Sequence, residues 1–261
     1  MSLLVALSGH GESDARLLAD AKALAGAGRW DMLGVHVGAP EDVAGLAGLD
    51  VEVFEQGDPA AQIVRRAAAD EVELIVLGLR TVPRSGLGSV AQCLLRDLAD
   101  PLLLVRPGMR PIGRLRRLLV PLEGSPSASE AMRYADEAFC APGREIVMLH
   151  VVTSDCPSEP GSLPAPRIVD QEQYEWSSWQ EEFTLRFAQC PKGGRHRVVV
   201  RVGEPVATIV REARDLDAEL VVLSWWGTLT GERAPVVRAM FEESPCPLLL
   251  VPAARPEWPA G

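Results

Sequence analysis

Gly88-Ser89 and the loop before them have the residue types of a turn that binds an anion. Glycine lets the backbone approach a phosphate closely, a serine hydroxyl donates a hydrogen bond, and a helix N-terminus adds free N–H groups with partial positive charge. Arg80 and Arg84 stand near enough in the sequence to add formal charge. The candidate ligand-binding set joins this loop to the turn after the first strand and comprises Ser8, Gly9, Gly78, Arg80, Thr81, Arg84, Gly86, Gly88 and Ser89. The alternative interpretation is a loop glycine followed by an ordinary serine N-cap.

Other kinds of chemistry have less support in the sequence. Residues 9–12 do not form the G-x-G-x-x-G pattern of a dinucleotide site, and no G-x-S-x-G elbow supports a hydrolase triad. His36 and His150 end equivalent strands, but no Asp, Cys or second His stands at ligand spacing. A packed or solvent-facing neutral imidazole is therefore favoured over metal ligation. We expect no catalytic residues and no metal site.

Short apolar segments must hold the candidate residues in place. The first half of the chain has five of them, at residues 3–7, 32–37, 51–54, 74–77 and 102–105. Unbroken apolar runs are typical of strands buried on both faces of a parallel sheet. Helical patterns separate them at 15–27, 41–49, 60–69 and 90–98. Ser13 or Asp14 is expected to cap the first of these helices, and Asp58 the third. In such α/β sheets, ligands bind at the carboxyl ends of the strands, where the strand order reverses.

The second half of the chain repeats the first. Residues 57–67 recur 146 positions later as 203–213, and the same offset carries 73–77 and 101–105 onto matching segments. Residues 3–9 recur as 118–124 with an offset of 115, which leaves 31 extra residues in the second copy. These include a loop and an expected helix at 169–188, whose aromatic stripe is interpreted as a core face. A period this long indicates two copies of one domain, expected at 1–108 and 116–254 with an exposed linker at 107–116.

The composition limits the class of protein. The chain has 261 residues, 47% of them hydrophobic, which is enough for two cores, and its net charge of −10 argues against general binding to nucleic acid or anionic membrane. Five cysteines without C-x-x-C spacing favour buried, reduced thiols. No signal peptide and no apolar stretch of membrane-spanning length is visible, so we expect a cytoplasmic protein.

Taken together, these motifs resemble the universal stress protein family. The resemblance rests on residues 118–125, the segment Leu149-His-Val-Val152, the Gly-Asp/Glu-Pro helix starts, the Glu-Leu-Ile/Val-Val-Leu segments and residues 246–251. It implies two flavodoxin-like α/β domains, each with a five-stranded parallel sheet and helices on both faces. In the family the final strands meet across a dimer interface, so we expect an intramolecular pseudo-dimer in which two sheets lie back to back. Nucleotide-binding members carry Gly-x2-Gly-x9-Gly-(Ser/Thr) after the fourth strand and an Asp after the first.

The chain departs from this family pattern in both copies. The first copy keeps Gly78, Gly88 and Ser89, but Thr81 replaces the second glycine in a shortened loop and Ser8 replaces the acid. The second copy has Glu123 for the acid, Ser224-Trp225-Trp226-Gly227 for the first glycines, and Pro235 at the position of Ser89. Because proline has neither an N–H nor a hydroxyl, we expect no triphosphate site in the second copy.

Three hypotheses about function follow from the resemblance and the departures. The leading one is a stress-response binding and regulatory protein without substantial catalysis, acting on an unidentified protein partner. The second is an ATP or adenine-nucleotide binder with slow ATP hydrolysis at the first copy. The third is a structural adaptor whose clefts are both empty. Further self-association as a homo-oligomer is expected if Trp225 and Trp226 lie in an exposed loop.

Overall fold

The computed structural model describes residues 2–46, 48–69, 72–79, 88–122, 128–152, 193–225 and 234–253. The predicted helix at 169–188 and the proline-rich loop before it lie outside the described residues. None of the helices in the described segments combines the length and the apolar character needed to cross a bilayer.

The first half of the chain folds in the predicted alternating order. Its strands and helices are β1 (Ser2–Leu7), α1 (Gly11–Gly28), β2 (Asp31–Val37), the 3-10 helix η1 (Pro40–Asp42), β3 (Asp50–Phe54), α2 (Pro59–Ala69), β4 (Val72–Gly78), α3 (Ser89–Asp97) and β5 (Leu102–Val105). Asp58 caps α2 by accepting the Ala61 N–H at 2.9 Å, as predicted. The helix predicted at 41–49 is wrong. Only η1 forms there, because Gly45 and Gly48 favour non-helical backbone and Gly48 has a φ of +88°.

The second half repeats this order. Its elements are β6 (Arg117–Pro121), α4 (Ser129–Phe139), β7 (Glu145–Val152), β8 (Arg195–Val202), α6 (Pro205–Asp215), β9 (Leu220–Trp225), α7 (Ala234–Glu243) and β10 (Leu248–Pro252). Glu204 caps α6 by accepting the N–H groups of Val206 and Ala207 at 3.0 and 2.7 Å. The duplication seen in the sequence is thus present in the fold.

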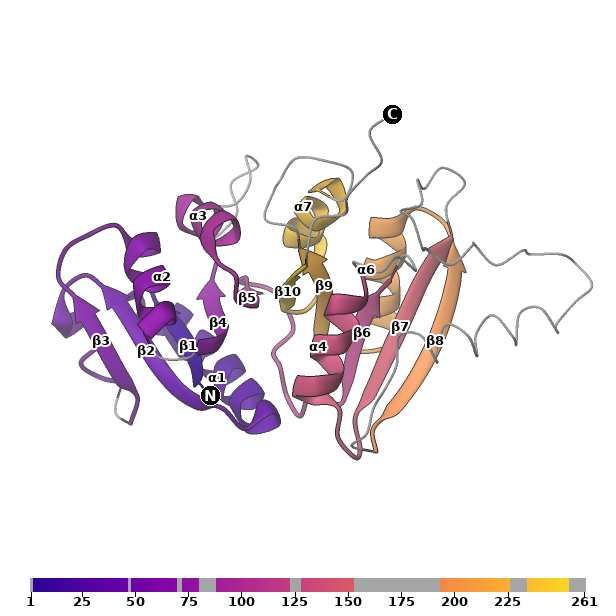
Figure 1. The fold of residues 1–261 in the computed structure, drawn as a ribbon, viewed down its shortest axis with the longest axis horizontal. Helices are drawn as coiled ribbons and strands as arrows, with labels where there is room; N and C mark the ends of the chain where they lie inside the picture. The colour runs from indigo at the N-terminus through magenta and orange to yellow at the C-terminus, as the bar shows by residue number, and fades with distance from the viewer. Residues whose placement is uncertain are drawn as a thin grey trace, which may run out of the picture.

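The two halves share one ten-stranded sheet with the order β3-β2-β1-β4-β5-β10-β9-β6-β7-β8 (Figure 1). Each half contributes five parallel strands, and β5 and β10 pair antiparallel through three leucines each. The final strands therefore meet, as the resemblance implied. The expectation of two sheets lying back to back is wrong: the sheets join edge to edge. This junction pairs the backbone groups that each half would otherwise expose along an apolar edge strand.

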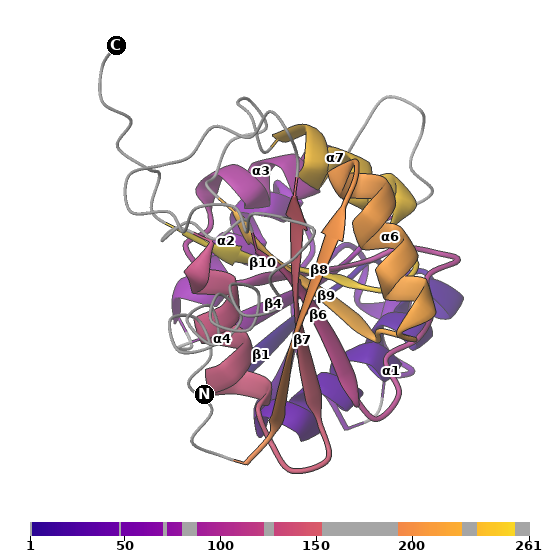
Figure 2. The ribbon, with the colours of Figure 1, turned by 90° about the vertical axis from the view of Figure 1, so that its right-hand side faces the viewer.

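Two apolar layers cover the sheet, one on each face, and both run through both halves. One contains the buried side chains of α1 and α4 and the other those of α2, α3, α6 and α7. Figure 2 shows α4 and α6 on opposite sides of the β7–β8 end. The halves also touch through Trp30 and Phe139, whose rings meet edge to face with centroids 5.7 Å apart. The fold is therefore a three-layer α/β arrangement with an internal pseudo-two-fold.

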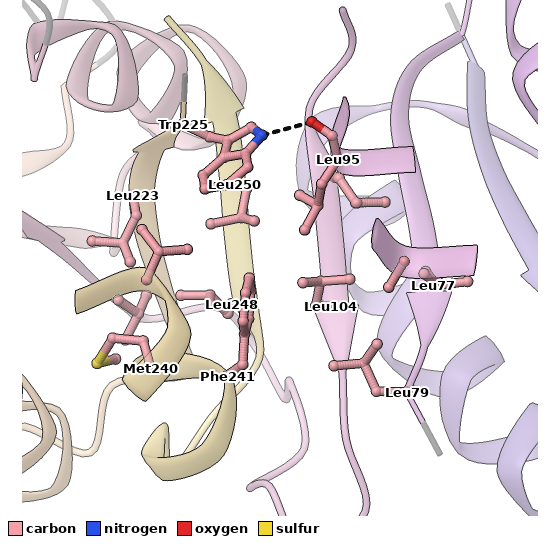
Figure 3. Packing of buried hydrophobic residues seen from close by; sticks show 14 of the residues in the cluster. Leu77, Leu79, Leu95, Leu104, Leu223, Trp225, Met240, Phe241, Leu248 and Leu250 are labelled. Atoms are coloured by element: carbon pink, nitrogen blue, oxygen red, sulfur yellow. Dashed lines mark hydrogen bonds between the residues drawn. The ribbon is translucent and has the colours of Figure 1, made fainter. Parts of the chain in front are cut away.

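Two side chains at the junction bind helix ends of the opposite half. The indole N–H of Trp225 donates to the Leu95 carbonyl of α3 at 2.8 Å (Figure 3). The Arg106 guanidinium donates to the carbonyls of Phe241 and Ser244, at and just beyond the end of α7, at 3.1 and 2.9 Å. The last carbonyls of a helix lack intrahelical donors. Each half thus supplies donors that the other half needs.

The cysteines depart from the expectation of reduced thiols. Cys93 and Cys246 are free, and burial raises the pKa of the Cys246 thiol to about 12. Cys140, at the end of α4, is disulfide-bonded to a partner outside the described residues. The absence of C-x-x-C spacing argues only against pairs of cysteines close together in the sequence, and a bond between distant cysteines depends on the fold.

Candidate functional site

The candidate site lies at the carboxyl ends of β1 and β4. The strand order reverses between these neighbours, since β2 and β3 lie on one side of β1 and β4 and β5 on the other. The register pairs Ala6 with Leu77, so the turn that begins at Ser8 and the exposed Gly78 follow at the same edge of the sheet. This edge is where ligands bind in open α/β sheets.

The start of α3 is open at this edge. Ser89 is the first residue of the helix and Gly88 is its N-cap; both are exposed, and no side chain of the described residues caps the helix. The interpretation of Ser89 as an ordinary N-cap is therefore wrong. Its hydroxyl and the first free N–H groups of α3 face solvent, where they can bind an anion. Arg80, Thr81, Arg84 and Gly86 lie outside the described residues.

Asp14 organises the turn after β1. Its Oδ1 accepts the Ser8 N–H at 3.0 Å and the Ser8 hydroxyl at 2.9 Å, and its Oδ2 accepts the Gly9 N–H at 2.8 Å. The side chain is buried. The sequence had suggested Asp14 as the N-cap of α1, but α1 begins at Gly11 and the carboxylate turns back to the preceding turn. Ser8 and Gly9 thus already bind an anionic group, which the chain itself provides.

His36 fills the space between the ends of β1 and β2. Its Nδ1 donates to the Leu7 carbonyl at 3.2 Å, and its buried Nε2 has no hydrogen-bond partner in the described part of the chain. A Cβ on Gly9 or Gly38 would lie 2.9 or 2.6 Å from the imidazole, so these glycines allow it to pack there. The predicted packed histidine is confirmed. Asp42, six residues later in η1, comes within 3.6 Å of Nε2, a contact that the spacing did not reveal.

The second half keeps the histidine and has a buried serine at the matching strand end. His150 Nδ1 donates to the Leu122 carbonyl at 2.9 Å, and burial lowers the pKa of His150 although this hydrogen bond opposes the shift. Ser224, the counterpart of Gly78 in the repeat, is buried. Its hydroxyl donates to the Ala128 carbonyl at 3.2 Å and accepts the Ala131 N–H at 3.3 Å. The hydroxyl therefore binds the start of α4 at this edge.

Trp225, the next residue, lies at the junction between the two halves. It is the last residue of β9 and only 6% exposed, and its side chain packs with Leu248 and Leu250 in the core cluster that joins the halves (Figure 3). The expectation that Trp225 lies in an exposed loop is wrong, because Trp225 belongs to β9 and its indole bonds to α3 of the first half. Trp226, Gly227 and Glu123 lie outside the described residues. Pro235, which the repeat aligns with Ser89, lies in the first turn of α7 as its second residue.

Comparisons with known proteins agree with this architecture. The sequence model of the universal stress protein family matches residues 114–252. A universal stress protein from Archaeoglobus fulgidus DSM 4304 has a similar structure, with a TM-score of 0.66 and 18% identity over 97% of this chain and 96% of that one. A protein of unknown function from Pseudomonas aeruginosa PAO1 has a TM-score of 0.58 and 14% identity over 97% and 92% of the two chains. These two likenesses show the fold alone. No curated protein matches the chain.

Proposed function

The chain belongs to the universal stress protein family, and from this membership we propose that it is a tandem member acting as a stress-response binding and regulatory protein without substantial catalysis. The proposal treats the first half as a second domain of the family, since it repeats the strand order of the matched half. Ligand occupancy of the first crevice would regulate an unidentified protein partner in the cytoplasm. The second crevice would bind no ligand.

The difference between Gly78 and Ser224 carries this proposal. Gly78 is exposed at the end of β4, whereas the Ser224 hydroxyl is buried in two hydrogen bonds to the α4 region. Opening the second crevice would break these two bonds. Each buried hydrogen-bonding group that loses its partner in this way destabilises the fold by about 1–3 kcal/mol. The first crevice needs no such opening.

An adenine nucleotide is the proposed ligand, with its phosphates at the start of α3. Gly88 and Ser89 offer free N–H groups and a hydroxyl there, and the sequence places Arg80 and Arg84 in the preceding loop. The turn after β1 is unsuited to phosphate because its donors already bind the Asp14 carboxylate. A second negative charge beside that carboxylate would be repelled. Ser8 and Gly9 would therefore bind Asp14 rather than the phosphates.

The proposal of a binding rather than a hydrolytic role also rests on Asp14. A general base must have an oxygen free to take a proton from the attacking water. Asp14 is the buried carboxylate of this turn, and its two oxygens already accept three hydrogen bonds. Slow ATP hydrolysis would thus have to depend on another group.

Calorimetric titration of the full chain with ATP and with AMP tests the proposal. We expect one saturable site per chain and little phosphate release. Ser89→Pro removes a hydroxyl and an N–H at the first helical position, where proline is compatible with the helix, and should weaken binding at least about tenfold. Ser129→Pro makes the same change at the first position of α4 and should leave binding intact.

Three results would contradict parts of the proposal. Two equivalent sites per chain would show that the second crevice is open. An unchanged affinity in Ser89→Pro would remove the start of α3 from the site. No saturable binding at millimolar nucleotide would favour the structural adaptor, and rapid phosphate release would favour the hydrolytic alternative.

A further inference from the structure

Three side chains that can bind a metal meet at the amino end of the sheet in the second half. A carboxylate oxygen of Asp136, the sulfur of Cys140 and a ring nitrogen of His196 all lie within 4.8 Å of one another. This is the one group of three or more such residues in the described part of the chain. Asp136 and Cys140 are buried and His196 is partly buried.

The fold brings these residues together from distant parts of the sequence. Asp136 and Cys140 stand one helical turn apart at the end of α4, and β8 places His196 opposite Ile146 of β7. The Asp136 Oδ1 and the His196 Nε2 are 2.6 Å apart. Gly194 lets the start of β8 approach the sulfur, because a Cβ there would lie 2.5 Å from the Cys140 Sγ. The three groups are therefore held by packing and not by a loop.

The donor set matches zinc better than magnesium or calcium. Zn²⁺ binds thiolate, imidazole and carboxylate ligands, whereas Mg²⁺ and Ca²⁺ bind oxygen. Tetrahedral Zn²⁺ with bonds of about 2.0–2.3 Å separates its ligand atoms by about 3.3–3.5 Å. The three donor atoms lie within 4.8 Å of one another, a separation that side-chain rotation can adjust toward this value. A cation is also favoured at the C-terminal end of a helix, where Cys140 lies.

Cys140 is disulfide-bonded, and a disulfide sulfur is not a thiolate ligand. The three-ligand set is therefore complete only when the disulfide is reduced. We propose that reduction of this disulfide creates a zinc site formed by Asp136, Cys140 and His196, with a fourth position open to water. A dithiol reductant supplies two electrons and two protons to the disulfide, giving two thiols, and itself becomes a disulfide. Zn²⁺ then displaces the Cys140 thiol proton, which passes to solvent, and the Zn–S bond forms.

The zinc site is separate from the nucleotide crevice. The crevice lies at the carboxyl ends of β1 and β4 in the first half, whereas Cys140 precedes β7 and His196 lies near the start of β8. The proposal therefore does not depend on nucleotide binding. It makes the second half a redox-dependent metal-binding unit.

Zinc binding by the full chain in its reduced and oxidised forms tests this proposal. The protein is reduced with a dithiol, freed of reductant without oxygen and equilibrated with Zn²⁺, and bound metal is measured by mass spectrometry. We expect one zinc per reduced chain and none per oxidised chain. His196→Gln and Cys140→Ser should each lower the zinc affinity of the reduced protein at least about tenfold. Cys93→Ser, which alters a free cysteine elsewhere, should leave it unchanged.

Cobalt provides a second measurement that does not depend on the variants being equally stable. Co²⁺ in the reduced wild-type protein should show thiolate-to-cobalt charge-transfer absorption, which oxidation should abolish. The proposal is overturned if the reduced wild-type chain binds no stoichiometric zinc or if the oxidised chain binds it equally well. It is also overturned if folded His196→Gln keeps the wild-type affinity.

Discussion

Trp225→Phe tests whether the two halves stabilise each other through the donor that crosses their junction. The substitution keeps an aromatic ring in the pocket and removes the indole N–H, which donates to the Leu95 carbonyl at 2.8 Å. That carbonyl belongs to the last turn of α3, where no intrahelical N–H can replace the lost donor. Because the bond is buried, water does not replace it either.

The cost follows from the acceptor that is left unpaired. A buried carbonyl without a donor lowers the free energy of unfolding by about 1–3 kcal/mol. For a chain of this size, each kcal/mol lost lowers the Tm by about 2–4 °C. The midpoint of urea unfolding, followed by circular dichroism, should therefore fall while the slope of the transition stays the same. The unchanged slope would show that both halves still unfold together.

Trp30→Phe is the matched control. It also removes an indole N–H bond, to Glu73 Oε2 at 2.7 Å, but that carboxylate is partly exposed and water can take the place of the indole. We therefore expect Trp30→Phe to lower the free energy of unfolding by less than Trp225→Phe does. The reasoning about the junction is refuted if Trp225→Phe is no more destabilising than Trp30→Phe.

Three more perturbations test other parts of the structure. Asp14→Asn leaves a donor of the β1 turn without an acceptor and should cost about 1–3 kcal/mol in thermal unfolding. Gly194→Ala places a methyl group 2.5 Å from the Cys140 sulfur and should destabilise the fold by about 1–3 kcal/mol through overpacking. Burial lowers the pKa of the folded-state His150 imidazole. As the pH falls below about 6.5, the imidazole is therefore protonated more readily in the unfolded chain than in the folded one, and the free energy of unfolding decreases. His150→Gln should reduce that decline in unfolding experiments at several pH values.

These expectations have their own controls. Glu12→Gln changes an exposed carboxylate in the same turn of α1 as Asp14. Its free energy of unfolding should stay within about 0.5 kcal/mol of that of the wild type. Gly26→Ala adds a methyl group with no atom within 4 Å and should be neutral or stabilising. Equal stabilities of Gly194→Ala and Gly26→Ala, or a pH profile unaffected by His150→Gln, would contradict the packing described here.

Apart from the helix predicted at 41–49, the repeat and the apolar runs predicted the order of the described strands and helices, since both are local properties of the sequence. The resemblance to the family also implied that the final strands of the two halves would meet. Their antiparallel pairing into one sheet was not predicted, because whether two apolar edges pair directly or are covered separately depends on the twist and packing of whole sheets.

The candidate site was predictable only in part. Gly78 and the start of α3 lie at the expected edge, because the carboxyl ends of parallel strands meet there. The return of the Asp14 carboxylate to Ser8 and Gly9 has no sequence signature beyond an acid in the first turn of a helix. The pair formed by Asp136 and His196 spans 60 residues and required the fold to bring β8 beside α4.

The antiparallel β5–β10 pairing lies within a single polypeptide, and this matters for how the two crevices can change. In an assembly of two identical subunits, every substitution appears in both copies at once. Here a mutation at one crevice leaves the other untouched, while the leucine contacts between the edge strands keep the partners together. A single chain of this kind therefore lets the residues of each crevice change independently of those in the other.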